Sequence, residues 1–312
     1  MKVIRGLINL PQNFQQCVLT LGNFDGIHLG HQALIERIKE IGKAKGLPTV
    51  VLIFEPQPTE FFKQLEAPAR LSSFYEKYTF IKSLGVDYLV AIPFNHSFSQ
   101  LSAQLFIEQC LISKLKAQYI VIGDDFRFGA GREGGAELLN HYANFNKFSV
   151  QAMSTYAING ERVSSTSVRK ALANNDFQHT KKLLGRPYSI QGKVIHGNQL
   201  ARKLGFPTAN IHLNRLKPAL HGVYFVKVDN VCNNEVHYGI ANIGIRPTIN
   251  GKVAILEVNI FDFNQDIYGQ YLQVEFIKKI RDEVKFDSLA DLQLQIAQDI
   301  CIAEQIKAKF YY

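Results

Sequence analysis

The stretch Leu21–His31, with the sequence LGNFDGIHLGH, lies between an apolar run and an amphipathic segment and decides the fold of the first half. The apolar run Val18–Gly22, which overlaps the start of this stretch, predicts a short strand. Apolar residues then recur at helical spacing from Leu34 to Ile41. A second β-branched run follows at Thr49–Phe54. Strand, helix and strand within about forty residues predict a βαβ unit with a right-handed crossover.

The same alternation continues along the first half of the chain. Apolar runs predict further strands at Tyr88–Ile92, Tyr119–Gly123 and Phe148–Met153. Helical patterns cover Ala103–Lys116, Glu137–Asn144 and Ser167–Leu184. Residues 1–184 are therefore expected to form an α/β domain, a parallel sheet with helices on both faces.

Strands dominate the second half, residues 185–312. They are predicted at Ile190–His196, Gly222–Val228, His237–Ile243, Ala254–Phe261 and Tyr271–Phe276, with a final helix at Ser288–Lys309. Short strands at close spacing favour a small antiparallel β-barrel followed by a C-terminal helix. The change in pattern places the domain boundary near Gly185.

Composition restricts the classes of function. The 312 residues carry a net charge of +8, which fits nucleic acid, an acidic membrane surface or nucleotide phosphates as ligands. No segment has the length of a membrane span and no signal peptide is evident. Four cysteines without metal-ligand spacing, Cys17, Cys110, Cys232 and Cys301, predict reduced and mostly buried thiols in a cytoplasmic protein.

The Leu21–His31 stretch has the features of a phosphate site. Gly22 and Gly26 let the backbone approach a ligand closely, and the following helix presents free N–H groups. His28 and His31 lie three residues apart, so both imidazoles can donate to phosphate oxygens. The alternative is a glycine-rich turn with two surface histidines, whereas zinc binding lacks a nearby third ligand.

Two later segments can complete this site. The hydroxyls of Val163–Arg169 can bind phosphate beside the guanidinium of Arg169, or they can simply cap a helix. The carboxylates of Gly123–Gly129 can bind magnesium or a ribose, or they can form an acidic turn beside two core phenylalanines.

The second half contains its own candidate site. Thr208 and Asn210 offer hard oxygen donors suited to magnesium, and Gly205 allows close approach of a phosphate. An ordinary turn is the alternative for this segment. Strand alternation directs Leu256 and Val258 to a barrel interior and Glu257 to the opposite face, where a carboxylate is usually solvated.

In combination and order, these motifs resemble the bacterial bifunctional riboflavin kinase/FMN adenylyltransferases, the FAD synthetases. The resemblance rests on Gly22–His31, Phe54–Pro58, Gly123–Gly129, Ser164–Arg169 and the run Gly185–Phe286. It covers nearly the entire chain and implies a Rossmann-like nucleotidyltransferase domain before a riboflavin kinase barrel. Gln57 and Asn259 stand where histidine is expected in the family, and Asn198 stands where aspartate is common.

The resemblance implies two reactions in series. Glu257 is expected to take the proton of the riboflavin 5′-hydroxyl, which attacks the γ-phosphorus of ATP and gives FMN and ADP. Thr208 and Asn210 would hold the ATP-bound magnesium. In the first domain the FMN phosphate would attack the α-phosphorus of a second ATP, with His28 and His31 stabilising the developing charge, and FAD and pyrophosphate would form.

The other expected site residues divide by ligand. ATP or its phosphates would contact Gly22, Asn23, Phe24, Gly26, Ser164, Ser165, Thr166, Arg169 and Gly205. The flavin or ribose candidates are Asp124, Asp125, Phe126, Asn242 and Arg281.

The expected partners are the small molecules riboflavin, FMN and ATP, with weak self-association compatible with the sequence and no membrane partner. One rival interpretation is an enzyme with only one working module, but both candidate residue sets are intact. Another is a nucleic-acid-binding barrel, which the dispersed positive charges disfavour because such barrels need aromatics on a basic surface.

Overall fold

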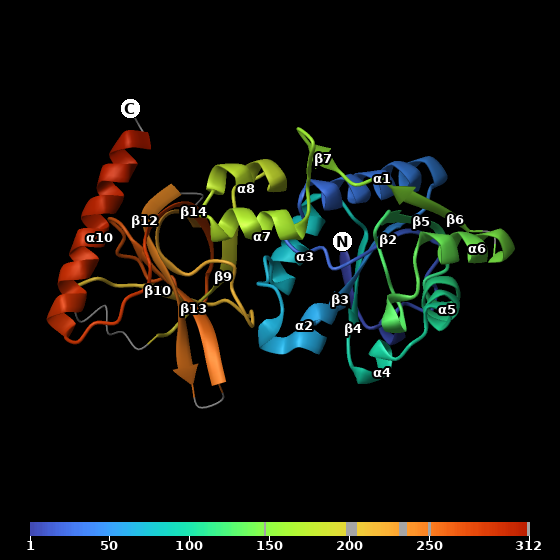
Figure 1. Cartoon of the computed structure of the whole chain (residues 1–312), viewed down its shortest axis with the longest axis horizontal. Helices are drawn as coiled ribbons and strands as arrows, with labels where there is room; N and C mark the ends of the chain where they lie inside the picture. The colour runs from blue at the N-terminus through green and yellow to red at the C-terminus, as the bar shows by residue number, and fades with distance from the viewer. Residues whose placement is uncertain (147, 198–204, 231–235, 249–250, 311–312) are drawn as a thin grey trace. The chain divides into compact units, whose positions relative to one another are not determined.

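The computed structural model describes residues 1–146, 148–197, 205–230, 236–248 and 251–310. The chain folds into two compact units (Figure 1). Unit 1 contains Met1–Pro68 and Glu76–Ser167, and unit 2 contains Ala69–Tyr75 and Val168–Tyr312.

Unit 1 is built on a six-stranded parallel sheet, which confirms the predicted fold class. In chain order the strands are β1 (Lys2–Arg5), β2 (Cys17–Leu21), β3 (Thr49–Glu55), β4 (Tyr88–Pro93), β5 (Ala117–Gly123) and β6 (Ser149–Met153). They lie in the order β1-β4-β3-β2-β5-β6, and every neighbouring pair is parallel. The edge strand β1 has no counterpart among the predicted strands.

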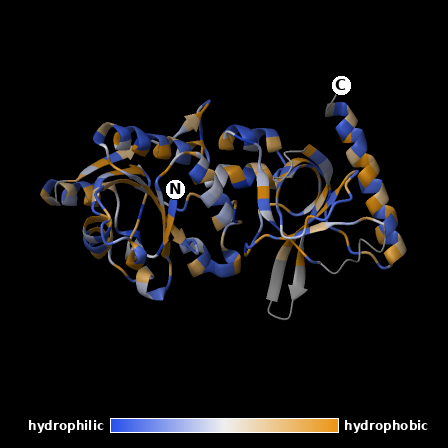
Figure 2. Cartoon of the chain, turned by 180° about the vertical axis from the view of Figure 1, so that it is seen from behind, coloured by the Kyte–Doolittle hydropathy of each residue, from blue (hydrophilic) through white to orange (hydrophobic). Residues whose placement is uncertain are grey.

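Helices cover both faces of this sheet because alternate strand residues are apolar on each side. Leu19, Val50 and Val90 share one buried cluster with Phe106 and Leu111 of the π-helix η3 (Phe106–Lys114). The other face receives α1 (Leu29–Lys45), which contacts β2, β3 and β5. Figure 2 shows hydrophobic strands beside helices that carry both hydrophilic and hydrophobic residues.

The remaining helices of unit 1 are short. They are η1 (Leu7–Asn9), α2 (Pro58–Lys63), η2 (Gln64–Glu66), α3 (Phe74–Ser83, whose first two residues belong to unit 2), α4 (His96–Ser99), α5 (Ala103–Leu105), η4 (Ala130–Arg132) and α6 (Ala136–Asn146). A hairpin of β7 (Ala157–Ile158) and β8 (Glu161–Arg162) follows β6. The sequence did not predict α2 or α3.

The order of the strands reverses at β2. The chain passes from β2 to β3 on one side and later places β5 on the other. The loops that leave the carboxyl ends of β2 and β5 therefore diverge, and in open α/β sheets such a switch point is where ligands bind.

Unit 2 is a closed antiparallel barrel followed by a long helix, as predicted. Its strands are β9 (Ser189–Ile195), β10 (Ala209–His212), β11 (Gly222–Asn230), β12 (Val236–Thr248), β13 (Gly251–Ile260) and β14 (Tyr271–Arg281). They close in the order β10-β13-β12-β11-β14-β9. The helix α10 spans Leu289–Phe310. The strand β10 was not predicted.

The predicted helix over Ser167–Leu184 is two helices, α7 (Ser165–Ala173) and α8 (Phe177–Leu184). The chain breaks because Asn175 has a φ of +55° and Asp176 caps α8 by accepting from the His179 amide. Most of α7 and all of α8 belong to unit 2. The predicted boundary between two functional domains at residues 184 and 185 stays a prediction.

The thiols differ in exposure. Cys17 and Cys110 are buried, and burial raises their pKa values to about 12 and about 11. Cys301 is exposed on α10, and Cys232 lies outside the described residues.

A buried ion pair joins α10 to the barrel. Asp299 is 1% exposed, and its carboxylate accepts from Arg281 Nε at 2.9 Å and from Arg281 Nη2 at 2.8 Å. Gln295 Nε2 donates to the same carboxylate at 3.0 Å. Both the guanidinium and the carboxylate are thus held in a defined geometry.

We expect Asp299→Ala to lower the free energy of unfolding by about 3 kcal/mol, because it leaves a half-buried guanidinium without its carboxylate. Urea denaturation followed by circular dichroism measures the change. Glu304→Ala, an exposed acid on the same helix, is the control and should change stability by less than about 0.5 kcal/mol. Equal effects of the two variants would contradict a stabilising role for the pair.

Candidate active sites

A cavity of about 340 Å³ lies at the switch point of unit 1. Segments that are distant in the sequence form its wall: the loop after β2, the loop after β5, the end of β6 and the start of α7. The expected residues that line it are Gly22, Asn23, Phe24, His28, His31, Asp124, Asp125, Phe126, Ser164, Ser165 and Thr166. The structure therefore brings most of the first predicted site together.

The loop after β2 turns sharply. Phe24, Gly26 and Ile27 have φ values of +47°, +81° and +42°, all in the left-handed region. Gly26 is buried and is not among the residues lining the cavity. Its lack of a side chain serves this turn, because L residues adopt such φ values at a cost. Its predicted contact with phosphate stays a prediction.

The two histidines lie at the start of α1, as their spacing predicted. His28 is the N-cap residue, and its Nδ1 accepts from the His31 amide at 3.4 Å. The two rings stack with centroids 3.7 Å apart, and His28 is only 7% exposed. Because Nδ1 acts as an acceptor, the neutral His28 ring carries its proton on Nε2, which is the atom able to donate to a ligand.

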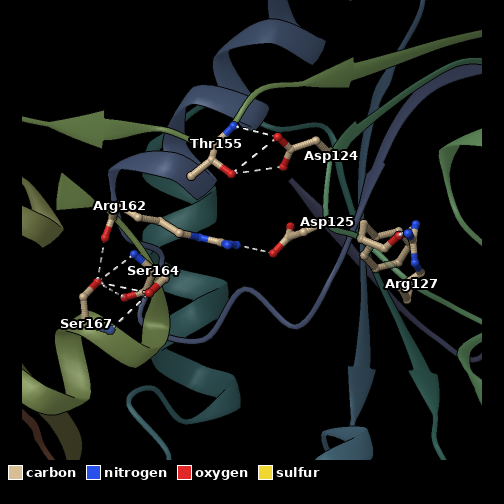
Figure 3. Close-up of polar contacts among 8 residues, drawn as sticks. Asp124, Asp125, Arg127, Thr155, Arg162, Ser164 and Ser167 are labelled. Carbon is tan, nitrogen blue, oxygen red and sulfur yellow. Dashed lines mark hydrogen bonds and ion pairs between the residues drawn. The ribbon is translucent and has the colours of Figure 1, made fainter. Parts of the chain in front are cut away.

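The loop after β5 has polar partners among the other residues that line the cavity (Figure 3). Asp124 accepts from the amide and from the hydroxyl of Thr155, each at 3.1 Å. Asp125 forms an ion pair with Arg162 of β8. Sequence reasoning missed Thr155 and Arg162, although Arg162 directly precedes the predicted hydroxyl segment.

The hydroxyl segment has mixed roles. Ser164 and Ser167 cap α7 reciprocally, since each side chain accepts from the backbone amide of the other (Figure 3). Ser165 Oγ donates to the Asp25 carbonyl at 2.8 Å, while Thr166 lines the cavity. Arg169 belongs to unit 2, where its Nε donates to the Ala69 carbonyl. A phosphate contact by Arg169 stays a prediction.

Unit 2 contains a separate cavity of about 320 Å³ beside β10. Thr208 and Asn210 line it together with Val258, Ile260 and the loop Phe263–Tyr268. The structure thus brings the two predicted magnesium ligands to one cavity.

Glu257 lies next to this cavity on β13. It is half-buried, and it pairs in register with Asn210 of β10 on one side and with Asn242 of β12 on the other. Residues directly opposite each other in antiparallel strands project from the same face, so these three side chains form a polar row. Leu256 and Val258 are fully buried, as the predicted alternation requires. Glu257 itself is not among the residues lining the cavity.

Asn210 of β10 and Thr208, which comes just before this strand, offer oxygen atoms that fit a magnesium ion. Asn210 Nδ2 donates to the Thr208 carbonyl at 3.3 Å, which leaves Oδ1 as the hard donor of the amide. Gly197 lies against this amide so closely that a Cβ there would be 2.5 Å from Nδ2 and 2.8 Å from Oδ1. The Asn210 amide therefore occupies the space that a side chain at position 197 would need.

The other described residues singled out in the second half of the sequence do not line this cavity. Gly205 is exposed, with a φ of +89° and open space where a Cβ would point. Arg281 is held by Asp299, and Asn242 Oδ1 is buried and accepts no hydrogen bond from the described residues. Asn259 donates to the Pro207 carbonyl at 2.8 Å and so supports the loop before β10. Asn198 lies outside the described residues.

Comparisons with known proteins match this two-part organisation. The family model for FAD synthetase matches residues 10–167, and the model for riboflavin kinase matches residues 184–307. A relative from Haemophilus influenzae, named bifunctional riboflavin kinase/FMN adenylyltransferase, is 45% identical over 99% of both chains. The chain belongs to this family. Its activities are therefore riboflavin kinase and FMN adenylyltransferase.

Further relatives agree in extent. The bifunctional enzyme of Escherichia coli K12 is 45% identical over 98% of this chain and 97% of its own. A solved structure from Streptococcus pneumoniae, described as a macrolide-efflux protein, has a TM-score of 0.76 and 32% identity, covering 97% of this chain and 98% of that one. Among the described residues, no helix is both long and apolar enough to cross a membrane.

We expect Gly197→Ala to lower riboflavin kinase turnover by about tenfold or more, because the new methyl group would displace the Asn210 amide from this space. Kinase assays with varied ATP measure the change. FMN adenylylation by the same preparation is the internal control and should remain at the parent rate. A variant with parent kinase kinetics would show that the position of the amide does not matter.

Proposed function

We propose that the two cavities divide the family's two reactions between them. The switch-point cavity performs adenylyl transfer, and the β10–β13 face of the barrel performs riboflavin phosphorylation. The observation that carries this assignment is the convergence of His28, His31 and the predicted phosphate-binding loops on one cavity at the carboxyl ends of β2 and β5.

In adenylyl transfer, an oxygen of the FMN phosphate attacks the α-phosphorus of ATP. The bond from that phosphorus to the bridging oxygen breaks, and pyrophosphate leaves. Negative charge grows on the α-phosphate oxygens and on the leaving group. His28 Nε2–H and the amides at the start of α1 other than that of His31 would donate to these oxygens, which would lower the barrier without a protein nucleophile.

In riboflavin phosphorylation, the Glu257 carboxylate accepts the proton of the 5′-hydroxyl as that oxygen attacks the γ-phosphorus of ATP, and ADP leaves. Thr208 and Asn210 would hold magnesium, which would offset the charge of the ATP phosphates. The buried Asn242 Oδ1, one strand away from Glu257, offers an acceptor for a substrate hydroxyl. Asn210, on the opposite side of Glu257, completes the row.

The remaining assignments belong to the same proposal. Gly22, Asn23 and Phe24 contact ATP from the loop after β2, and Asp124, Asp125 and Phe126 face the ribose or flavin from the loop after β5. Contacts of Arg169 and Gly205 with phosphate and of Arg281 with flavin are further expectations. We also expect the protein to be cytoplasmic, to self-associate weakly and to have no nucleic-acid partner.

We expect His28→Ala to reduce FAD formation from FMN and ATP by about 100- to 1,000-fold, the effect of losing a donor aimed at transition-state charge. Chromatography of a reaction started with riboflavin should show FMN accumulating. Circular dichroism checks the fold. An equal loss of both activities in a folded variant would argue against separate sites.

We expect Glu257→Gln to reduce riboflavin kinase turnover by about 100-fold or more, because the amide keeps the shape of the side chain but cannot accept the proton. The KM for ATP should change little, and FAD synthesis from supplied FMN should be unaffected. Steady-state assays of both steps measure these effects. Phosphorylation of riboflavin at the parent rate would remove Glu257 from the mechanism.

A further inference from the structure

The loop after β2 is held by side chains from three different elements. Each side chain donates to a backbone carbonyl, and the carbonyls alternate along the loop. Lys77 Nζ of α3 donates to Asn23 at 2.7 Å, Ser165 Oγ of α7 donates to Asp25 at 2.8 Å, and Gln32 Nε2 of α1 donates to Ile27 at 2.9 Å. The loop they hold contains the left-handed residues Phe24, Gly26 and Ile27.

Lys77 is unusual because its side chain is completely buried. It is 0% exposed and lies among the largest fully buried side chains of the chain's described part. Lysine is almost never fully buried unless its ammonium group has partners, because its desolvation is costly. Packing alone therefore does not explain why a buried lysine donates to a backbone carbonyl of this loop.

The geometry of the peptide bond explains what the Lys77 hydrogen bond does to the loop. In a trans peptide the C=O of one residue and the N–H of the next point in opposite directions. Lys77 holds the Asn23 carbonyl toward the interior and does not itself line the cavity, whereas Asn23 and Phe24 do. The Phe24 N–H is thereby directed to the cavity side, and it makes no hydrogen bond to any described residue.

We propose that Lys77 and Gln32 are positioning residues for adenylyl transfer. From behind the loop Lys77 holds the Asn23 carbonyl, so that the Phe24 amide presents its N–H to the phosphates of ATP, and Gln32 holds the Ile27 carbonyl and thereby fixes the course of the loop. The ammonium group also polarises the Asn23–Phe24 peptide, which strengthens Phe24 N–H as a donor. The inference rests on the proposed assignment of adenylyl transfer to this cavity.

The test compares Lys77→Met with the parent in the full-length chain, using FMN, ATP and magnesium. Methionine keeps the length of the side chain but donates no hydrogen bond. We expect kcat for FAD formation to fall by about 10- to 100-fold, less than for loss of a donor that contacts the transition state directly, because Lys77 acts through the Phe24 amide. The KM for FMN should change less than about threefold. Lys77→Arg, which keeps a cationic donor, should recover part of kcat.

Lys116→Met is the matched control. Lys116 Nζ also donates to a backbone carbonyl in unit 1, that of Phe14 at 2.8 Å, but neither residue lines the cavity. This variant should keep the parent kcat. Kinase activity of each preparation reports on the barrel, and melting temperatures ensure that assays are made on folded protein.

Parent-like kcat in folded Lys77→Met would overturn the proposal, as would a loss that Lys77→Arg does not repair at all. If Lys77→Met does not fold, Gln32→Leu decides: a lowered kcat supports the proposal and a parent-like kcat refutes it. His28→Ala separates the two levels of inference. If it impairs FAD formation while the positioning variants do not, only the role of Lys77 and Gln32 fails. If it also has no effect, the assignment of the cavity fails.

Discussion

The reversal of strand order at β2 is the constraint on which the cavity of unit 1 depends. Because β3 and β5 flank β2 on opposite sides, the connections from β2 and β5 must leave the sheet in different directions. The space between them is lined mainly by loops and by helix starts, with only the last residues of β2, β5 and β6 taking part. The histidines, the acidic loop and the α7 hydroxyl segment meet there although they come from distant parts of the sequence.

In the barrel, strand pairing rather than strand order brings the polar residues of the candidate site together. Its closure fixes the pairing of β10, β13 and β12, and this pairing alone aligns Asn210, Glu257 and Asn242 across three strands. Polar residues that would be solvated on an isolated strand thereby become a row with defined spacing. The first site is thus made at the ends of strands, and the second is made on their faces and in the adjoining loops.

This difference explains what the sequence could predict. Local patterns encode the βαβ unit, the shared face of His28 and His31, and the burial of Leu256 and Val258, and the structure agrees with each. Hydrogen-bond and ion-pair partners that are brought together only by tertiary packing leave no local pattern in the sequence. Ser165 reaches the Asp25 carbonyl across 140 residues of sequence, and Arg281 pairs with Asp299 on a helix that only the fold brings near. The strands β1 and β10 were missed because each has only four residues.

The use of the basic residues follows from the same packing. The net charge of +8 fitted phosphate among other anionic ligands, yet three cations of the described chain are engaged with protein groups. Arg162 meets Asp125, Arg281 meets Asp299, and Lys77 meets a backbone carbonyl. In the proposed reaction at the switch point, imidazoles and backbone amides would therefore be the main donors to the triphosphate. Amides are weak donors individually, so their effect depends on being held in a fixed direction before the ligand arrives. In the role proposed for it, Lys77 would supply that direction from behind the peptide without contacting the leaving group.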